Sequence, residues 1–218
     1  MSDSASATVA RPPAQVVSFY DRFARFYELW GSVVDGRARR RIVELCAVRD
    51  GDTVLDVATG TGAVLLPLAR RTPNGRTIGV DLAEGMLVKA RARAAGVPGV
   101  ELLTASALQL PLPDDSVDVA TSAYMLDILP LEELRAAVRE LARVLRPGGR
   151  LVVCNVTPGE RRRHRLPELL YASPLPLTSN CRGIRALPLL EEAGLTGVRR
   201  EYSAQLLMPS EIVLARAT

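Results

Sequence analysis

The sequence contains few residues of the kinds that define several classes of protein. Aromatic residues make up 4% of its 218 residues, which is too few for the stacking surfaces that bind single-stranded nucleic acid. The basic and aromatic residues are not interleaved either, so nucleic acid is a poor fit as a partner. No 18 consecutive residues are apolar, so we expect no membrane-spanning helix.

Cysteine is also scarce. Cys46, Cys154 and Cys181 are odd in number and far apart, which argues against a disulfide framework and fits no zinc-ligand spacing. We expect no metal site, and we expect these thiols to be buried as small apolar side chains. Residues 1–15 lack the basic start and apolar stretch of a signal peptide, so we expect a disordered tail and a cytoplasmic protein.

Charge is nearly balanced, with 28 Lys and Arg against 24 Asp and Glu. Two basic clusters stand out, residues 37–41 and residues 161–165, and the second contains the only histidine, His164. Such clusters are usually solvated surfaces, and the alternative is attraction to phosphate, nucleic acid or an anionic lipid surface. A peripheral contact with a membrane is therefore compatible with the sequence.

Apolar residues make up 48% of the chain, which is typical of a globular domain. Residues 16–48 predict an N-terminal helical cap, because apolar and aromatic side chains recur at steps of three and four residues. The first part of this face consists of Val16, Phe19, Tyr20, Phe23, Phe26, Tyr27 and Trp30, and the second of Ile42, Leu45 and Cys46. The cap either covers an edge of a sheet or closes a pocket.

From about residue 52 the sequence alternates between strand and helix patterns. Strands are expected at 53–57, 76–80, 100–104, 117–122 and 150–156, helices at 63–71, 84–95, 131–145 and 187–193, and a final strand pair at 198–207 and 212–215. Helical crossovers imply parallel pairing. We therefore expect an α/β fold, a doubly wound, mostly parallel seven-stranded sheet with an antiparallel last strand. Ligands bind such sheets at the carboxyl ends of the strands, where strand order reverses.

Two carboxylates and a glycine-rich turn stand at that edge. The turn, 56–62 (DVATGTG), follows the first strand, and glycine lets the backbone approach a ligand closely, although an ordinary turn can also carry a glycine pair. Asp81 ends the next strand, where a carboxylate can accept hydrogen bonds from both ribose hydroxyls. A nicotinamide-dependent oxidoreductase shares these features. Leu65 replaces its third glycine, however, and Asp56 suits a ligand with an amino group and a sulfonium better than a diphosphate.

Four segments in order resemble the successive motifs of the class I S-adenosylmethionine-dependent methyltransferases. They are VLDVATGTG (54–62), TIGVDLAEGML (77–87), ALQLPLPDDSVDVATSAYML (107–126) and LRPGGRLVV (145–153). Within that family the chain is similar to the branch of ubiquinone/menaquinone-biosynthesis C-methyltransferases. Its N-terminal segment FYDRFARFYELW (19–30) also resembles the segment that precedes the domain in that branch. The resemblance implies a catalytic domain over 49–218, with 158–190 as an insertion that builds the acceptor pocket.

The resemblance also implies a set of residues that bind S-adenosylmethionine. Asp56, Ala58, Thr59, Gly60 and Gly62 would line its methionine half, Asp81 would bind the ribose, Leu82, Met86, Ser106 and Ala107 would surround the adenine, Ser122 would lie below the sulfonium, and Tyr20 and Tyr27 would close the pocket. Two positions depart from the family pattern. Ala58 stands where many members have the first glycine of the loop, and Ser106 replaces the usual Asp or Asn.

Methyl transfer from a sulfonium needs alignment first and a general base only when the acceptor must lose a proton. Many relatives carry a histidine soon after the fourth strand, but this chain has Tyr124-Met125-Leu126-Asp127-Ile128 there. Asp127 and Tyr124 are the substitutes, although Asp127 could simply cap the next helix. His164 is a third candidate, although a histidine within an arginine cluster is more often solvated.

The apolar residues of 158–190 and the aromatic cap favour a small, lipophilic acceptor, such as a quinol-like compound, a phenol or an aminolipid. The sequence leaves three functions open: methyl transfer, binding of the cofactor without transfer or with rearrangement of the substrate, and nicotinamide-dependent oxidoreduction. It also leaves open whether the protein is a monomer or a homodimer.

Overall fold

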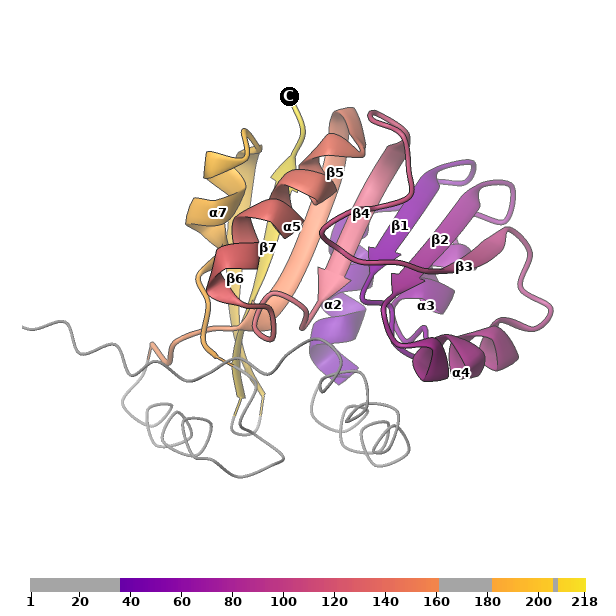
Figure 1. Ribbon diagram of the computed structural model, residues 1–218, viewed down its shortest axis with the longest axis horizontal. Coiled ribbons are helices and arrows are strands. Elements are labelled where there is room, and N and C mark those ends of the chain that lie inside the picture. The colour runs from indigo at the N-terminus through magenta and orange to yellow at the C-terminus, as the bar shows by residue number, and fades with distance from the viewer. Residues whose placement is uncertain (1–35, 161–181, 206–207) are drawn as a thin grey trace, which may run out of the picture.

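The computed structural model describes residues 36–160, 182–205 and 208–218. Its elements, labelled as in Figure 1, are α2 (Gly36–Cys46), β1 (Thr53–Val57), α3 (Leu65–Ala69), β2 (Arg76–Asp81), α4 (Glu84–Ala94), β3 (Val100–Thr104), β4 (Val117–Ala123), α5 (Leu131–Arg143), β5 (Leu145–Val156), α7 (Ala186–Glu192), β6 (Thr196–Gln205) and β7 (Met208–Arg216). The tail, the first part of the predicted cap and most of 158–190 lie outside these residues.

All seven strands form one sheet in the order β3-β2-β1-β4-β5-β7-β6. The pairs β1–β2, β1–β4, β2–β3 and β4–β5 are parallel, whereas β7 is antiparallel to both of its neighbours. The predicted doubly wound sheet is therefore confirmed. Strand order reverses between β1 and β4, and this switch point is where a ligand is expected to bind.

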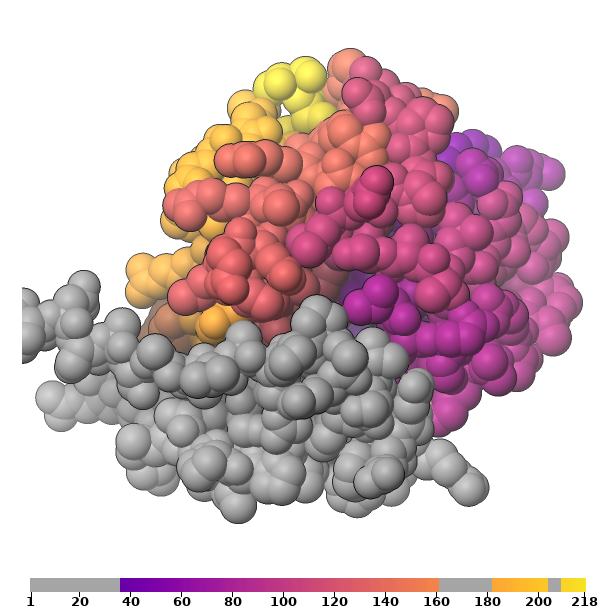
Figure 2. Space-filling model, viewed as in Figure 1, coloured from indigo at the N-terminus to yellow at the C-terminus, as the bar shows by residue number. Residues whose placement is uncertain are grey.

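Helices cover both faces of the sheet, and each face has its own apolar cluster. Successive side chains of a strand point to opposite faces, so Val54 packs with the residues of α2 whereas Leu55 packs with those of α5 and α7. In Figure 1, α5 and α7 lie in front of the sheet and α2 behind it. The space-filling view shows α5 and the connection between β3 and β4 spread over the front face (Figure 2). The aspartate that follows Leu55 faces the α2 side, below the glycine-rich turn.

Several elements differ in their bounds from those predicted, and β7 begins at Met208 rather than residue 212. Helix α3 begins at Leu65 rather than residue 63, because the turn continues through Gly62, whose φ is +80°. Strand β5 begins at Leu145 rather than residue 150, since Leu145 already pairs with Val117. A shift of register between Val117 and Val119 accommodates Pro147-Gly148-Gly149 within β5. Helix α5 ends earlier, at Arg143, so the prediction that these residues stop it at residue 145 is wrong.

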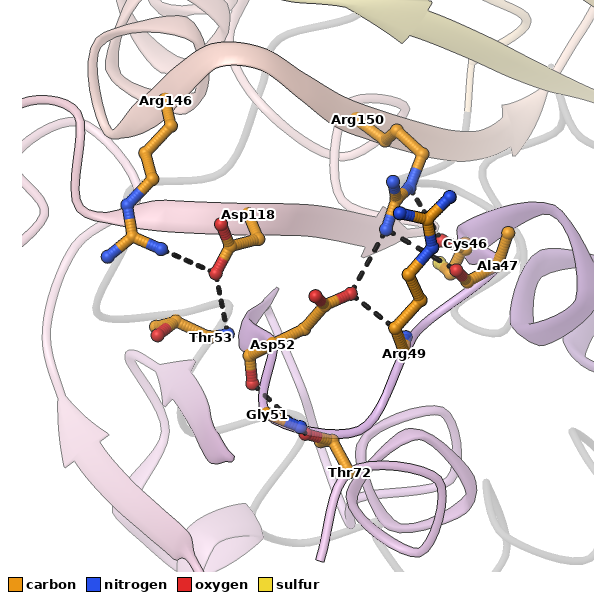
Figure 3. Close-up of polar contacts among 10 residues, drawn as sticks. All are labelled: Cys46, Ala47, Arg49, Gly51, Asp52, Thr53, Thr72, Asp118, Arg146 and Arg150. Carbon is orange, nitrogen blue, oxygen red and sulfur yellow. Dashed lines mark hydrogen bonds and ion pairs between the residues drawn. The ribbon is translucent and has the colours of Figure 1, made fainter. Parts of the chain in front are cut away.

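A cluster of charges at the amino ends of the strands fixes the end of α2 to the sheet (Figure 3). Arg150 of β5 donates from Nε to the carbonyl oxygen of Cys46 at 3.0 Å and from Nη2 to that of Ala47 at 3.3 Å. The same guanidinium pairs with Asp52 at 3.1 Å. The last carbonyl groups of a helix have no partner within the helix, so Arg150 both satisfies them and sets the position of α2.

The thiols lie where the sequence predicted, as far as they are described. Cys46 and Cys154 are buried and not in disulfides, and burial raises the pKa of Cys46 to about 12. Cys181 lies outside the described residues. Within the described ranges, no helix is both long and apolar enough to cross a bilayer.

Candidate cofactor-binding site

The carboxyl ends of β1, β2 and β4 meet at the switch point. Val57 of β1 lies beside Val80 of β2 on one side and Ser122 of β4 on the other. The Ser122 hydroxyl, which is buried, donates to the carbonyl oxygen of Val57 at 2.9 Å. Ser122 therefore ties β4 to the start of the glycine-rich turn, directly below the place where a ligand would sit.

The turn itself has a backbone that suits glycine. Gly60 and Gly62 have φ angles of +54° and +80°, and Ala58 has +57°, a region that residues with a Cβ rarely adopt. A Cβ added at Gly60 would meet no atom of the described residues within 4 Å, whereas one at Gly62 would lie 3.4 Å from Leu66 Cγ. Gly60 thus presents bare backbone to open space, and Gly62 serves the packing of the turn onto α3.

Asp81 organises the turn through its carboxylate. One oxygen accepts the Gly60 N–H at 2.7 Å, and the other accepts the Ala83 N–H at 2.9 Å. A carboxylate oxygen can accept more than one hydrogen bond, so the same side chain can also receive hydroxyl groups of a ligand. Because Asp81 is half-buried at the end of β2, it is held in place yet open to a ligand.

Asp56 is the second carboxylate of the site and is 2% exposed. It accepts a hydrogen bond of 2.7 Å from the Thr59 hydroxyl. Burial raises the pKa of Asp56 to about 7, against the Thr59 hydrogen bond, and the negative charge of Asp81 adds to the rise. A cationic ligand beside Asp56 would reverse that effect, because an opposite charge favours the ionised carboxylate.

The predicted adenine-side residues lie next to Asp81. The Ala105 N–H donates to the Asp81 carbonyl oxygen at 3.1 Å, which brings Ser106 and Ala107 beside the end of β2. Ser106 Oγ accepts the Leu108 N–H at 3.2 Å. Leu82 is 48% exposed at the start of the loop and Met86 is buried on α4. Asp81, Leu82 and Ser106 therefore lie together at one edge of the sheet.

Gly79 is a residue of this site that the sequence reasoning missed. A Cβ there would come within 2.7 Å of Leu102 Cδ2, 2.9 Å of Leu65 Cδ2 and 3.1 Å of Thr59 Cγ2, so a side chain at position 79 would displace the residues packed between the turn and β2. A glycine inside a predicted strand was the available signal. Leu65 stands where a dinucleotide-binding enzyme has its third glycine. Its side chain is fully buried and packs against Gly79.

The acceptor-side candidates follow β4. Tyr124 has a φ of +58°, its N–H donates to the Cys154 carbonyl oxygen at 2.7 Å, and its hydroxyl lies 3.3 Å from Ser210 Oγ. Asp127 is 1% exposed. The predicted alternative that Asp127 caps the next helix is wrong, because α5 begins after Pro130 and shows no side-chain cap among the described residues. Tyr20, Tyr27 and His164 lie outside the described residues.

These features match the ligand that the sequence motifs imply. A bound adenosine would need a carboxylate for its ribose and bare backbone near its methionine part, and Asp81 and the Gly60 backbone lie together at the switch point. An amino group and a sulfonium would need nearby negative charge, and Asp56 is the buried carboxylate next to the turn. Comparison with known proteins agrees: residues 54–149 match the family model described as a methyltransferase domain.

Residues 54–149 form a class I methyltransferase domain.

Relatives of known sequence place this methyltransferase domain in one branch. The chain is 39% identical over 149 residues to a ubiquinone/menaquinone biosynthesis C-methyltransferase of Geobacter sulfurreducens, covering 66% of this chain and 57% of the relative. It is 43% identical over 126 residues to the demethylmenaquinone methyltransferase of Thermus thermophilus, covering 57% of this chain and 56% of the relative. The matched region thus spans little more than half the length of these relatives.

Solved structures confirm the fold of the methyltransferase domain. Magnesium protoporphyrin IX methyltransferase from Synechocystis PCC 6803 with bound SAH superposes with a TM-score of 0.77 at 17% identity, over 95% of this chain and 100% of that one. The [4+2]-cyclase SpnF superposes with a TM-score of 0.74 at 22% identity, over 96% and 97% of the two chains. At these identities the likeness shows the fold alone.

Proposed function

We propose that this protein binds S-adenosylmethionine and transfers its methyl group to a small, lipophilic acceptor, with a quinol-like ring as the first choice. The observation that carries this proposal is that two carboxylates hold the glycine-rich turn: Asp81 accepts the Gly60 N–H, and Asp56 accepts the Thr59 hydroxyl. When bound, the cofactor supplies an electrophilic methyl group. The names of the sequence relatives support a quinol acceptor and methylation at carbon.

In this proposal each carboxylate has one task. Asp81, already held by the Gly60 and Ala83 N–H groups, binds the two ribose hydroxyls. Asp56 supplies negative charge on the side of the amino group and the sulfonium, where its buried position strengthens the attraction. The Ser122 hydroxyl keeps the first turn and β4 at a fixed spacing. Together these residues would orient the methyl group for in-line displacement.

The acceptor side would be formed from the loop after β4. Methylation at a ring carbon is promoted when a phenolic hydroxyl loses its proton, so a general base is useful. Tyr124 and Asp127 are the described candidates for that role, and we propose that one of them receives the proton. The positive φ of Tyr124 supports a functional role, since bulky residues in the left-handed region of backbone conformation are strained and cluster at active sites.

Transfer of a radiolabelled methyl group tests this proposal directly. We expect label in product when the protein is given labelled S-adenosylmethionine and a demethylmenaquinol with a short prenyl chain, and none with a simple aminolipid. Tyr124→Phe or Asp127→Asn should lower kcat by roughly 10²–10⁴-fold if that residue is the base. Asp118→Asn, at the amino end of β4, is the matched control and should leave kcat unchanged.

The stretch after β4 also favours a second function, because it has no histidine. The protein could then bind the cofactor and use its positive charge without transferring the methyl group. Tight binding of the cofactor with no label in any of the phenolic, quinol or aminolipid products would support this second function and overturn the first. Saturating binding of a reduced nicotinamide dinucleotide would overturn both.

A further inference from the structure

Glu211 is a charged residue within an otherwise apolar part of β7, and the chemistry proposed above does not use it. Its side chain is 0% exposed. Ile212, the next residue, packs with the α2 cluster, so Glu211 points to the opposite face, towards α7. A buried carboxylate is costly unless it is paired and hydrogen-bonded, so its retention calls for a physical reason.

Its two oxygens accept hydrogen bonds from several elements at once. Oε1 accepts the Ala186 N–H at 2.6 Å, at the start of α7, and a weaker bond of 3.4 Å from Asn155 Nδ2 on β5. Oε2 accepts Arg200 Nε of β6 at 2.5 Å and the Thr157 hydroxyl at 3.3 Å. Glu211 is therefore the buried common acceptor of a network whose outer member, Arg200, is 30% exposed.

This network fixes the segment 182–186. Asn155 Nδ2 donates to the Ile184 carbonyl oxygen at 2.8 Å, and the Ile184 N–H donates to the Val156 carbonyl oxygen at 2.9 Å. The backbone of Gly183 lies so close to β5 that an added Cβ would come within 2.8 Å of the Pro158 nitrogen. Residues 182–186 are thus held against the carboxyl end of β5 by both sides of their backbone.

The same segment reaches the loop after β4. The Arg182 N–H donates to the Asp127 carbonyl oxygen at 3.0 Å. A continuous series of hydrogen bonds therefore runs from Glu211 through 182–186 to Asp127, which is one of the two described candidates for contact with the acceptor. Hydrogen bonds in a buried, low-dielectric network are strengthened and stiffen the segments that they join, although Asn155 Oδ1 accepts no hydrogen bond from the described residues.

We propose that Glu211 is a positioning residue for the acceptor side of the site. With Asn155 it holds 182–186, and 182–186 holds the backbone of the loop that carries Tyr124 and Asp127. The inference rests on the proposed function, because it assigns that loop to the acceptor. An apolar side chain at position 211 would fill the same space but would accept none of the four hydrogen bonds.

Glu211→Gln and Asn155→Ala test the inference, with Glu201→Gln as the matched control. Glu201 also pairs with an arginine, Arg41 at 2.7 Å, but it lies on β6 and faces α2. We expect amide exchange at Ile184 and Ala186 to be about tenfold faster or more in the two test variants, since their local opening becomes easier. The control should leave both amides protected as in the wild type.

Kinetic measurements add a test whose result a change in overall stability would not alter. With the demethylmenaquinol probe, both test variants should lose about tenfold to a hundredfold in kcat/KM for the acceptor, because a small displacement of reacting groups is expensive. Their affinity for SAH should stay within about twofold of the wild type, since Asp56 and Asp81 are untouched and distant, independent sites have little effect on one another.

Three results would overturn the inference: unchanged exchange at Ile184 and Ala186, equal acceleration of amides throughout the sheet, or equal losses for the cofactor and the acceptor. Asn155→Ala leaves the Glu211–Arg200 pair in place, so it decides the question if Glu211→Gln does not fold. If the wild type transfers no methyl group, the proposed function fails, and the exchange measurement still decides whether Glu211 holds the loop after β4.

Discussion

Asp56 links the ionisation of one buried residue to the binding of a cation. Its pKa is raised to about 7, so the folded apo protein holds a proton on Asp56 between about pH 4 and pH 7, whereas the unfolded chain does not. Stability therefore falls as the pH rises through that range and levels off above pH 7. Above pH 7 the charged carboxylate is buried at a cost of at most about 4 kcal/mol.

Asp56→Asn should remove this dependence. We expect the stability of the variant relative to the wild type to be greater at pH 8 than at pH 5, by about 1–3 kcal/mol, because Asp56 of the folded wild type is protonated at pH 5 and charged at pH 8. The variant should also bind S-adenosylmethionine more weakly, because it cannot become negative. Urea denaturation at the two pH values measures the first effect. If the two proteins differ in free energy of unfolding by the same amount at both pH values, Asp56 does not titrate as described.

Ala58 carries a different kind of strain, in its backbone. Its φ of +57° is a conformation that costs a residue with a Cβ about 1–2 kcal/mol more than glycine. Glycine, however, loses more conformational freedom on folding. We therefore expect Ala58→Gly to change the free energy of unfolding by no more than about 1 kcal/mol and to leave SAH affinity intact. A loss of several kcal/mol in a denaturation experiment would mean that the Ala58 methyl group has a packing role.

At the scale of single residues, the sequence motifs predicted which side chains border the site but not their conformations. Asp81 and Gly60 could be located because each stands at a fixed step from a predicted strand. The positive φ of Tyr124 and the burial of Glu211 depend on packing between strands far apart in the sequence. Gly79 could have been recognised from its place inside a strand, but the reason for a glycine there, the close packing of Leu102, Leu65 and Thr59, exists only in three dimensions.

Arg150 holds the C-terminal end of helix α2 against the sheet. The guanidinium satisfies two carbonyl oxygens at the end of the helix and pairs with Asp52 (Figure 3). Arg150→Lys keeps the charge but cannot reproduce the forked geometry. We expect it to lower the free energy of unfolding by about 1–3 kcal/mol, the range for hydrogen bonds to a charged group.

Arg135→Lys is the control for that measurement. Arg135 pairs with Glu192, and both side chains are more than half exposed, so its loss should cost about 0–1 kcal/mol. Chemical denaturation of both variants measures the difference. Equal costs would show that Arg150 is not the link between α2 and the sheet.

At the scale of elements, periodicity predicted β1 and β3 at their exact bounds and β2 and β4 to within one residue, whereas β5 and β7 begin five and four residues earlier than predicted. Helix ends were less certain: the turn before α3 persists to Val64, and Leu145 belongs to β5 because it pairs with Val117. Such bounds depend on tertiary pairing, which no local pattern contains.

The whole molecule combines a sheet that could be predicted with an acceptor side that could not. Alternating strands and helices dictate parallel pairing and a switch point, and a cofactor site follows from these. The acceptor has no comparable motif, because pocket shape depends on segments of irregular structure, and the matched relatives are covered over little more than half their length. Location in the cell and state of assembly stay predictions from composition.

Calorimetric titration with SAH tests the central claim, that Asp81 and the Gly60 turn hold an adenosine. The wild type should bind one SAH per chain. Asp81→Ala should weaken binding by about 1–3 kcal/mol, roughly 5- to 150-fold, because a charged hydrogen-bond partner is lost. Asp118→Ala, which removes a carboxylate bound to a backbone N–H at the opposite edge, should bind as the wild type does. No binding by the wild type, or an unchanged affinity in Asp81→Ala, would contradict the account.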